Sequence, residues 1–419
     1  MNQDWITSFE ALRSVYIDEA YSNMAINEAI SHHKGCRDSF VRTLVKGTIR
    51  DTIRIDSMID ELASGGVRSI KKRTLIVLRM ALYALRSMNS VPDHAAVDEA
   101  VKLARNVAKG TDRFVNAVLR SYLRRKDELE SRPVSLALKY SFPEGITELL
   151  RSQYGEETES ILKGLNEPPA VILRVNTLKT NAQELTELLR ESGRDAGPAD
   201  DSGLALWAEG SGIMNTPMFR DGLFTVQSLS SITAVRSLAP GPGSTVLDMC
   251  AAPGGKSTMM AEMMHNRGRI ISCDIHEHRL GLIQAASDRL GIDIIETRLL
   301  DGTVYDGLLE GKFDYVLADV PCSGLGVIST KPEIKLKADP DNFESLYQVQ
   351  QDILQNAVRY AKSGGIIEYS TCTLNKRENE NIVQELTKQS SFVSIVEMHT
   401  ILPYNNLVGF YYCKLRKNA

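Results

Sequence analysis

The sequence predicts an α/β fold built on a doubly wound, Rossmann-like sheet, preceded by an all-α bundle and a small α+β linking region. Three observations predict it. Residues 1–132 carry apolar side chains at helical spacing and almost no strand pattern. Residues 133–235 mix helix and strand patterns. Over residues 236–419 strands and helices alternate, which is typical of a parallel sheet. We therefore expect three domains with these bounds.

The first region is expected to hold four long helices, over residues 38–63, 69–88, 92–108 and 113–130. Pro92 separates two of them and Pro133 ends the bundle. The second of these helices opens on a basic cluster of Lys71, Lys72 and Arg73. In the linking region, two helices over 143–166 precede a strand within 168–180 and a helix over 181–193.

In the third region, strands are expected near residues 245–250, 269–275, 294–300, 313–320, 365–371 and 392–398. Helices are expected near residues 256–266, 278–290, 343–361 and 377–389. A last strand over residues 409–417 is predicted to lie antiparallel at an edge of the sheet.

Composition is that of a globular protein, with 43% hydrophobic and 24% charged residues in a chain of 419. No apolar run approaches the roughly 18 residues of a membrane span. The first residues, MNQDWITSFE, contain acids and lack the apolar segment of a secretory signal. We expect a cytoplasmic protein that has no membrane partner.

Cysteine and histidine spacing predicts no metal site. The six cysteines form no C-x-x-C pair, and the seven histidines show no zinc-ligand spacing. Scattered cysteines in a cytoplasmic chain are mostly buried apolar residues, so a functional cysteine must be argued from its neighbours.

The charge is unevenly distributed along the chain. Residues 1–132 hold 22 Lys and Arg against 17 Asp and Glu, a balance of +5, whereas the whole chain carries −4. A basic first domain ahead of an acidic remainder favours a nucleic-acid partner. A solvated helical surface would give the same balance, so both interpretations stay open on charge alone.

The stretch 245-TVLDMCAAPGGKST-258 reads as a strand, a Gly-rich turn and a helix that begins near Lys256. Such a turn binds polar or anionic ligands at the helix N-terminus. The phosphate-binding pattern G-x-x-x-x-G-K-[ST] requires Gly where this chain has Cys250, and Asp248 would repel a phosphate. The turn therefore predicts a ligand other than ATP.

Ligands of open α/β sheets bind beyond the carboxyl ends of the strands. In this chain the predicted strands end at the AAPGG turn, at Asp274, at Asp301, in 319-DVPCSG-324 and in 370-STCT-373. Three carboxylates and two cysteines are therefore expected along one edge of the sheet.

Asp274 lies twenty residues after Gly254, where nucleoside-binding sheets place an acid for the ribose hydroxyls. The dinucleotide pattern G-x-G-x-x-G is absent after the first strand, which argues against a dehydrogenase. A nucleoside without a pyrophosphate fits better, and S-adenosylmethionine is the common one.

Cys322 and Cys372 are expected on loops that leave adjacent strands at this edge. Buried structural thiols are the ordinary alternative. Because each of these cysteines stands between a strand and a polar turn, close to acids, both are candidate nucleophiles.

The motifs DMCAAPGGKS, DVPCSGLGV and YSTCTLNKRENE resemble those of the NOL1/NOP2/Sun-type RNA 5-methylcytosine methyltransferases. The segments RDSFVRTLVKGTIR, PDHAAVDEAVKLA and RFVNAVLR resemble the NusB-like RNA-binding domain, and LRVNTLK and FTVQSLSS resemble the linking region. The combination is similar to a bacterial family that methylates small-subunit ribosomal RNA. The resemblance covers nearly the whole chain.

The resemblance implies roles for four side chains. Cys372 would attack carbon 6 of cytosine, Cys322 would help to release the product, and Asp319 would contact the Watson–Crick edge. Lys256 would lie near the substrate or the carboxylate of the cofactor.

The resemblance also implies the cofactor and the partner. S-adenosylmethionine would be bound by Cys250, Ala251, Ala252, Pro253, Gly254, Gly255, Lys256, Asp274, Asp301 and Asp319. The substrate would be a specific cytosine of 16S rRNA, outside an intact duplex, before or early in small-subunit assembly, and the enzyme would act as a monomer.

Two alternatives stay open, a 5-methylcytosine enzyme that acts on tRNA and a non-catalytic NusB-like RNA-binding factor; a DNA methyltransferase is disfavoured because the Thr-Cys loop is present beside the Pro-Cys loop. Three positions depart from the family pattern. Ser228 replaces the usual Asp after Gln227, Leu300 stands where Gly is frequent, and Val408 stands where an acid precedes Gly-Phe. The first departure predicts a missing polar contact in the linking region.

Overall fold

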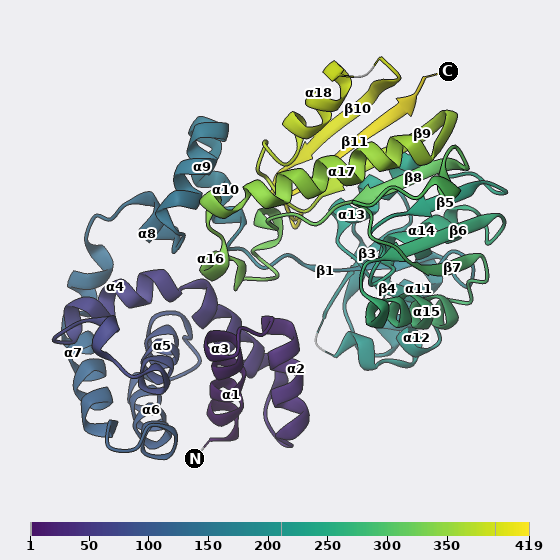
Figure 1. Cartoon of the computed structure of the whole chain (residues 1–419). Coiled ribbons are helices and arrows are strands. Elements are labelled where there is room, and N and C mark those ends of the chain that lie inside the picture. Colours follow the sequence, from purple (N-terminus) through teal and green to yellow (C-terminus); the bar gives the residue numbers. More distant parts are fainter. Residues whose placement is uncertain (1, 211, 390, 419) are drawn as a thin grey trace. The chain divides into compact units, whose positions relative to one another are not determined.

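The computed structural model of the protein describes residues 2–210, 212–389 and 391–418. The chain divides into two compact units (Figure 1). The first comprises Met1–Asn166 and Thr330–Ala338, and the second comprises Glu167–Ser329 and Asp339–Ala419. The division into three domains at residues 132 and 235 stays a prediction.

Among its described residues the first unit contains helices and no strand, as the sequence predicts, but the expected single helix over 38–63 is divided in two at Asp51. Its helices are α1 (Gln3–Ile17), α2 (Ser22–His32), α3 (Asp38–Arg50), α4 (Thr52–Leu62), α5 (Lys72–Ser87), α6 (Asp93–Val107), α7 (Asp112–Ser131), α8 (Leu136–Tyr140), α9 (Glu144–Tyr154), α10 (Thr158–Gly164) and α16 (Ile334–Lys337). The apolar faces of α1 to α7 share one core, in which α5 is central because it contributes ten buried apolar residues.

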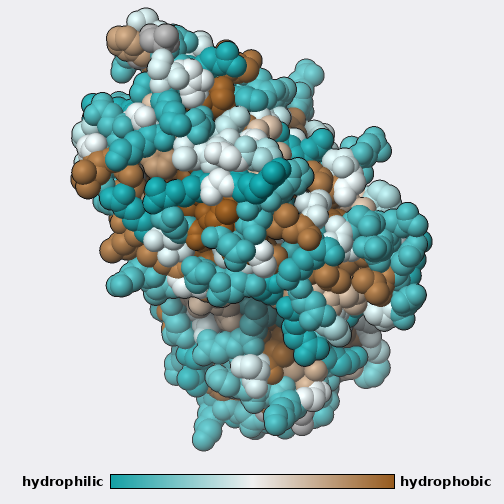
Figure 2. Space-filling model, turned by 90° about the vertical axis from the view of Figure 1, so that its right-hand side faces the viewer, coloured by the Kyte–Doolittle hydropathy of each residue, from teal (hydrophilic) through white to brown (hydrophobic). Residues whose placement is uncertain are grey.

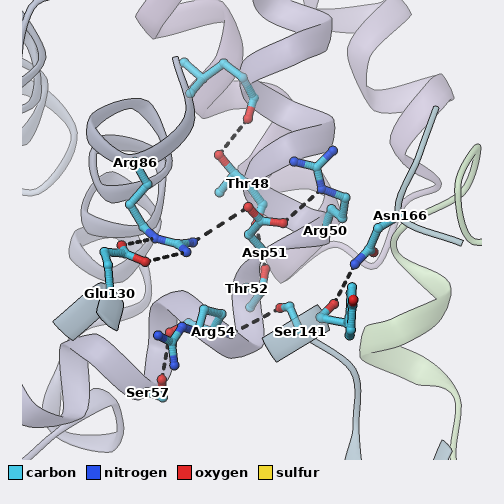
Figure 3. Close-up of polar contacts among 12 residues, drawn as sticks. Thr48, Arg50, Asp51, Thr52, Arg54, Ser57, Arg86, Glu130, Ser141 and Asn166 are labelled. Atoms are coloured by element: carbon cyan, nitrogen blue, oxygen red, sulfur yellow. Dashed lines mark hydrogen bonds and ion pairs between the residues drawn. The ribbon is translucent and has the colours of Figure 1, made fainter. Parts of the chain in front are cut away.

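A polar network joins the ends of α3, α5 and α7 (Figure 3). The Arg86 guanidinium donates to both oxygens of Glu130, at 2.6 and 3.1 Å, and lies 3.7 Å from Asp51. Arg50 donates to the same Asp51 carboxylate at 2.9 Å. Nearby, the backbone N–H of Arg54 donates to the Ser141 hydroxyl, which follows α8.

A short segment of the C-terminal half, residues 330–338, belongs to the first unit. Lys335 is 2% exposed, and its ammonium donates to the carbonyls of Arg50 and Tyr140 and to the Asn166 side chain. Burial lowers the pKa of Lys335 well below its ordinary value. The ammonium also lies 3.8 Å from the centre of the Phe142 ring.

The second unit opens with a small four-stranded antiparallel sheet, which confirms the predicted α+β region. Its strands are β1 (Val171–Val175), β2 (Ala196–Pro198), β3 (Ala205–Ala208) and β4 (Phe224–Val226), in the order β2-β3-β1-β4. Helices α11 (Ala182–Glu191) and α12 (Pro217–Arg220) complete it. The Asn181 side chain caps α11 by accepting from the backbone N–H of Glu184 at 3.0 Å.

The rest of the second unit is built on a seven-stranded, mostly parallel sheet, as predicted. Its strands are β5 (Thr245–Asp248), β6 (Arg269–Asp274), β7 (Ile295–Leu299), β8 (Phe313–Asp319), β9 (Ala361–Thr371), β10 (Val393–Ile401) and β11 (Phe410–Lys417). Their order is β10-β11-β9-β8-β5-β6-β7. Strands β5 to β9 are mutually parallel where they pair.

Helices cover both faces of this sheet (Figure 1). They are α13 (Leu229–Leu238), α14 (Gly255–Met263), α15 (Glu277–Leu290), α17 (Glu344–Tyr360) and α18 (Glu380–Gln389). Strand residues Val246, Leu247, Val316 and Leu317 have no exposed surface, as expected of parallel strands covered on both sides.

One strand prediction is wrong in position. The last strand, β11, is antiparallel as expected, but it lies between β9 and β10 and is not at the edge. The edge strands are β10 and β7. Alternation along β11 buries Tyr411, Cys413 and Leu415 completely on one face, and α13 packs against the strand as well, so β11 is buried like an inner strand.

Within the described ranges, no helix is long and apolar enough to cross a membrane. Figure 2 shows mostly hydrophilic side chains on the face in view, with hydrophobic residues scattered among them.

Candidate active site

The turn after β5 is shaped by one glycine. Gly254 has a φ of +101°, and a Cβ there would lie 3.2 Å from the Cα of Ile283. The N–H of Gly254 donates to the Ala251 carbonyl at 2.7 Å, and the N–H of Ala251 donates to the Cys273 carbonyl at 2.7 Å. The turn is thereby fastened to β6 before α14 begins at Gly255.

Arg174, from β1 of the small sheet, braces this turn. It is 1% exposed. Its guanidinium donates to the Gly255 carbonyl, to Thr258 at 3.0 Å and to Glu262 at 2.8 Å, and it also reaches the Gln227 side chain. A buried guanidinium with several acceptors and an ionic partner fixes the start of α14.

The acids at the ends of β6 and β7 lie on one side of the turn. Asp274 is 3% exposed and accepts from the N–H of His276 at 3.0 Å, and it pairs with Arg279 at 3.1 Å. Asp301 accepts from the backbone and hydroxyl of Thr303 at 2.9 and 2.6 Å. A hollow beside Asp301 is lined by Ile275, Arg298, Leu299, Leu300, Asp301, Val304, Tyr305, Asp306 and Gly307.

The end of β5 carries a buried acid. Asp248 is 1% exposed, and one of its oxygens accepts from the Ser257 hydroxyl at 2.6 Å. Burial raises the pKa of Asp248 to about 7, despite that hydrogen bond. Burial likewise raises the pKa of the neighbouring Cys250 thiol well above its ordinary value, so Cys250 is not a thiolate.

On the other side of the turn, Lys256 and Asp319 form an ion pair of 2.7 Å. The second oxygen of Asp319 accepts from the Ser370 hydroxyl at 2.8 Å. Burial lowers the pKa of Lys256, but the Asp319 charge and hydrogen bond outweigh it and raise the pKa above its ordinary value. The Lys256 ammonium also lies 5.4 Å from the centre of the Phe410 ring.

The two cysteines of the predicted site lie in contact. β8 and β9 are neighbours, and the sulfur atoms of Cys322 and Cys372 are 3.3 Å apart in free thiols. The hydrogen bond with Cys372 and burial raise the pKa of Cys322 well above its ordinary value. The N–H of Gly326 donates to the Cys372 carbonyl at 2.9 Å, which ties the two loops together.

The sheet edge therefore brings the predicted site residues together in a lateral order. Cys372 at β9 is followed by Cys322 and Asp319 at β8, the Cys250–Lys256 turn at β5, Asp274 at β6 and Asp301 after β7. The roles of these residues stay predictions. Among the described residues, no group of three or more His, Cys, Asp or Glu side chains is placed to hold a metal ion.

The three departures from the family pattern each take part in a local hydrogen bond. Ser228 caps α13 by accepting from the N–H of Ser231, and the loss of a polar contact elsewhere in the linking region stays a prediction. Val408 is 3% exposed, and its carbonyl accepts from Ser230 at 2.7 Å. The N–H of Leu300 donates to the Asp274 carbonyl at 3.2 Å, a bond that any residue except proline could make.

Sequence reasoning missed Arg174, Ser370 and Phe410. The motif LRVNTLK marks Arg174 only as part of a resemblance, because nothing local shows that β1 reaches α14. Ser370 could have been found, since it lies in the STCT segment at the carboxyl end of β9, two residues before Cys372.

Three family descriptions match the chain. They are the 16S rRNA methyltransferase RsmB/F over residues 235–415, the NusB family over 6–124, and the RsmF/B-like ferredoxin-like domain over 142–211. A probable ribosomal RNA small subunit methyltransferase B of Bacillus subtilis is 32% identical, over 98% of both chains. The chain belongs to the ribosomal RNA small subunit methyltransferase B family.

Other members of the methyltransferase B family agree. The probable enzyme of Synechocystis is 33% identical over 98% of both chains, and that of Pectobacterium atrosepticum is 32% identical over 91% of this chain and 90% of its own. A crystal structure titled PH0851 has a TM-score of 0.85 and 25% identity, and covers 100% of this chain and 99% of its own. A methyltransferase homologue from Pyrococcus horikoshii has a TM-score of 0.61 and 27% identity over 67% of this chain and 97% of its own.

Proposed function

We propose that the protein transfers a methyl group from S-adenosylmethionine to carbon 5 of a specific cytosine in 16S rRNA, through a covalent adduct between Cys372 and carbon 6. The single observation that carries the proposal is the contact of two free thiols, 3.3 Å apart, beside the Lys256–Asp319 ion pair. Membership in a family whose relatives are named for small-subunit rRNA methylation supports the substrate.

The residues at the sheet edge fit the cofactor. The buried Asp274 carboxylate at the end of β6 suits a ribose diol, and the hollow beside Asp301 offers apolar walls for an adenine. The backbone of the Cys250–Lys256 turn, at the start of α14, suits the amino acid end. When bound, S-adenosylmethionine supplies an electrophilic methyl group. The proposal needs no metal.

Cys372 would act as the nucleophile. Its thiolate would form a bond to carbon 6 of cytosine, and the electrons of the carbon 5–carbon 6 double bond would make carbon 5 nucleophilic. Carbon 5 would then take the methyl group as the methyl–sulfur bond of S-adenosylmethionine breaks and S-adenosylhomocysteine leaves. The methylated base would then be released from Cys372. The hydrogen on carbon 5 leaves as a proton to water, the carbon 5–carbon 6 double bond re-forms and the sulfur–carbon 6 bond breaks. Cys322, kept as a thiol by its raised pKa, would hydrogen-bond to the departing sulfur.

The ion pair suits the Watson–Crick edge of cytosine better than that of uracil. Cytosine presents an acceptor at nitrogen 3 and an amino donor at carbon 4. The Lys256 ammonium offers a donor and the Asp319 carboxylate an acceptor, 2.7 Å apart. In uracil the donor and acceptor are reversed, so the same pair would meet it with mismatched groups.

The helical first unit would supply RNA affinity. It carries the exposed cations Lys71, Lys72 and Arg73 at the start of α5, and its residues 6–124 match the NusB family. We expect the substrate to be rRNA before or early in small-subunit assembly and the enzyme to act as a cytoplasmic monomer. The target base must be outside an intact stack to reach Cys372.

The test uses Cys322→Ala with S-adenosylmethionine and small-subunit rRNA, run on a denaturing protein gel. If Cys372 attacks and Cys322 releases, the variant accumulates an RNA-dependent band of slower migration, and the double variant with Cys372→Ala does not. Methyl transfer that persists in Cys372→Ala would contradict the assigned nucleophile.

The same experiment separates the alternatives. An adduct that forms with tRNA and not with small-subunit rRNA would replace the proposed substrate. Methyl transfer to neither RNA by the wild-type protein would favour a non-catalytic RNA-binding factor.

A further inference from the structure

Glu378 stands in the motif YSTCTLNKRENE, and the proposed mechanism gives it no role. It lies in the turn between β9 and α18 and has no exposed surface. One carboxylate oxygen accepts from the N–H of Ser323 at 2.8 Å and from Gln350 at 3.0 Å. The other accepts from the Ser323 hydroxyl, from Thr373 at 3.3 Å and from Asn375 at 3.1 Å.

These contacts join the two cysteine loops through the residue that follows each cysteine. Ser323 follows Cys322, and Thr373 follows Cys372. The two hydroxyls also lie 2.7 Å apart. One carboxylate is therefore the common acceptor for both loops. Because the acceptor is a carboxylate, each of these bonds is charge-assisted and stronger than a hydrogen bond between neutral groups.

The backbone around Glu378 is fixed independently of its carboxylate. Its N–H donates to the Asn375 carbonyl at 2.9 Å, and its carbonyl accepts from the Tyr369 hydroxyl at 2.6 Å. The next residue, Asn379, accepts from Thr371 at 2.6 Å and donates to the Thr373 carbonyl at 3.0 Å. These backbone hydrogen bonds hold the Glu378 carboxylate in a fixed position, and the donors of both cysteine loops are directed toward it.

We propose that Glu378 is a positioning residue that holds Cys322 against Cys372, so that Cys322 can assist release of the adduct that Cys372 forms. The inference rests on the proposed function. The sulfur–sulfur distance of 3.3 Å is the geometry that Glu378 maintains. Its charge also contributes, after the hydrogen bond from Cys372 and burial, to raising the pKa of Cys322, which keeps the helper a thiol.

The main variant is Glu378→Gln, which has the same shape but is neutral. Its amide turns one acceptor oxygen into a donor that faces groups which themselves donate. The matched control is Glu385→Gln, an exposed acid on α18 that accepts from Gln351 at 2.7 Å.

The first readout needs neither RNA nor S-adenosylmethionine. The full-length protein is treated with iodoacetamide at pH 8, and alkylation of each cysteine is followed by mass spectrometry. In Glu378→Gln the rate at Cys322 relative to Cys372 should rise about fivefold or more, because the loop is freed and the neighbouring charge is gone. The control should match the wild type. An unchanged ratio would overturn the proposal.

The second readout is the covalent adduct. Glu378→Gln should accumulate the RNA-linked band that Cys322→Ala accumulates, since release slows more than attack. A general structural fault would instead lower attack and release together. Ser323→Ala, which removes one hydroxyl contact and keeps the carboxylate, should shift both readouts in the same direction by a smaller factor, and it covers the case in which Glu378→Gln does not fold.

The two proposals fail differently. If neither the wild type nor Cys322→Ala forms an adduct, the proposed function is wrong, and the alkylation ratio still tests whether Glu378 positions Cys322. If Cys322→Ala traps an adduct while Glu378→Gln and Ser323→Ala behave as the wild type in both readouts, the positioning role is wrong and the proposed function stands.

Discussion

Two buried side chains of opposite charge hold the two sides of the candidate site. On the cofactor side, Arg174 is 1% exposed and fixes the start of α14 with an ionic partner, Glu262. On the cysteine side, Glu378 has no exposed surface and is held by neutral donors from both loops.

The difference lies in where each brace comes from. Arg174 reaches α14 from another sheet, 88 residues before Glu262. Glu378 is five residues from Thr373. The cofactor side therefore depends on tertiary packing between β1 and α14, whereas the cysteine side is organised largely by its own motif. Damage to the first should show in global stability, and damage to the second in chemistry.

The largest stability effect is expected from Arg174→Met. It leaves the Glu262 carboxylate, 4% exposed, without its cation, and breaking a buried pair from one side typically costs about 3–5 kcal/mol. Urea unfolding followed by circular dichroism measures the loss. The double variant Arg174→Met with Glu262→Met should recover a large part of it, because no charge is left buried. Equal loss in single and double variants would contradict the ion-pair account.

The next effect is a dependence of stability on pH. Asp248 has a pKa raised to about 7 from 3.8, so the folded state holds a proton that the unfolded state has released. Stability should therefore fall as pH rises between about 4 and 7, by at most about 1.4 kcal/mol per pH unit, and level off above. Asp248→Asn, which cannot ionise, should lack this contribution. If the free energy of unfolding changed equally with pH in the wild type and in Asp248→Asn between about pH 4 and 7, the contribution assigned to Asp248 would be wrong.

A smaller effect is expected at the turn. Gly254→Ala places a Cβ at a φ of +101°, 3.2 Å from Ile283, while Gly243→Ala meets a φ of +87° with no atom within 4 Å. Both changes strain the backbone by about 1–2 kcal/mol, but only the first pushes α15 from the turn. Calorimetric titration with S-adenosylmethionine should show weaker binding for Gly254→Ala alone. Equal affinities would mean that the close approach does not shape the cofactor site.

The smallest effect concerns Ser228, beside Gln227 on the Arg174 side. Because serine and aspartate are both good N-caps, Ser228→Asp should change stability by less than about 0.5 kcal/mol, whereas Ser228→Ala should cost about 1 kcal/mol. Thermal unfolding distinguishes them. A gain above 1 kcal/mol in Ser228→Asp would show that the family's usual acid makes a contact beyond the cap.

The sequence predicts the sheet well because its periodic patterns are local. Each predicted strand of the large sheet is present. The expectation that Cys322 and Cys372 leave adjacent strands is confirmed, because β8 and β9 pair directly in the sheet. The order of the strands across the sheet is harder to predict. The sequence predicts β11 at an edge, but the strand lies between β9 and β10, because alternation alone does not show what covers a strand's two faces.

Long-range polar contacts could not be predicted. Lys335 and Glu333 are almost fully buried in the helical unit, where Lys335 donates to the Arg50 carbonyl and Glu333 accepts from the backbone N–H of Ser22, partners more than 280 residues away along the chain. Arg174 is hidden from sequence reasoning for the same reason, as its acceptors lie more than 50 residues away along the chain.

The most direct measurement of the central claim is the identity of the methylated nucleoside. Small-subunit rRNA is incubated with labelled S-adenosylmethionine and the wild type, Cys372→Ser or Cys322→Ser, then digested and analysed by mass spectrometry. The account predicts 5-methylcytidine with the wild type, none with Cys372→Ser, and at most one turnover with Cys322→Ser. A methyl group on another atom or base, or normal turnover by Cys372→Ser, would contradict it.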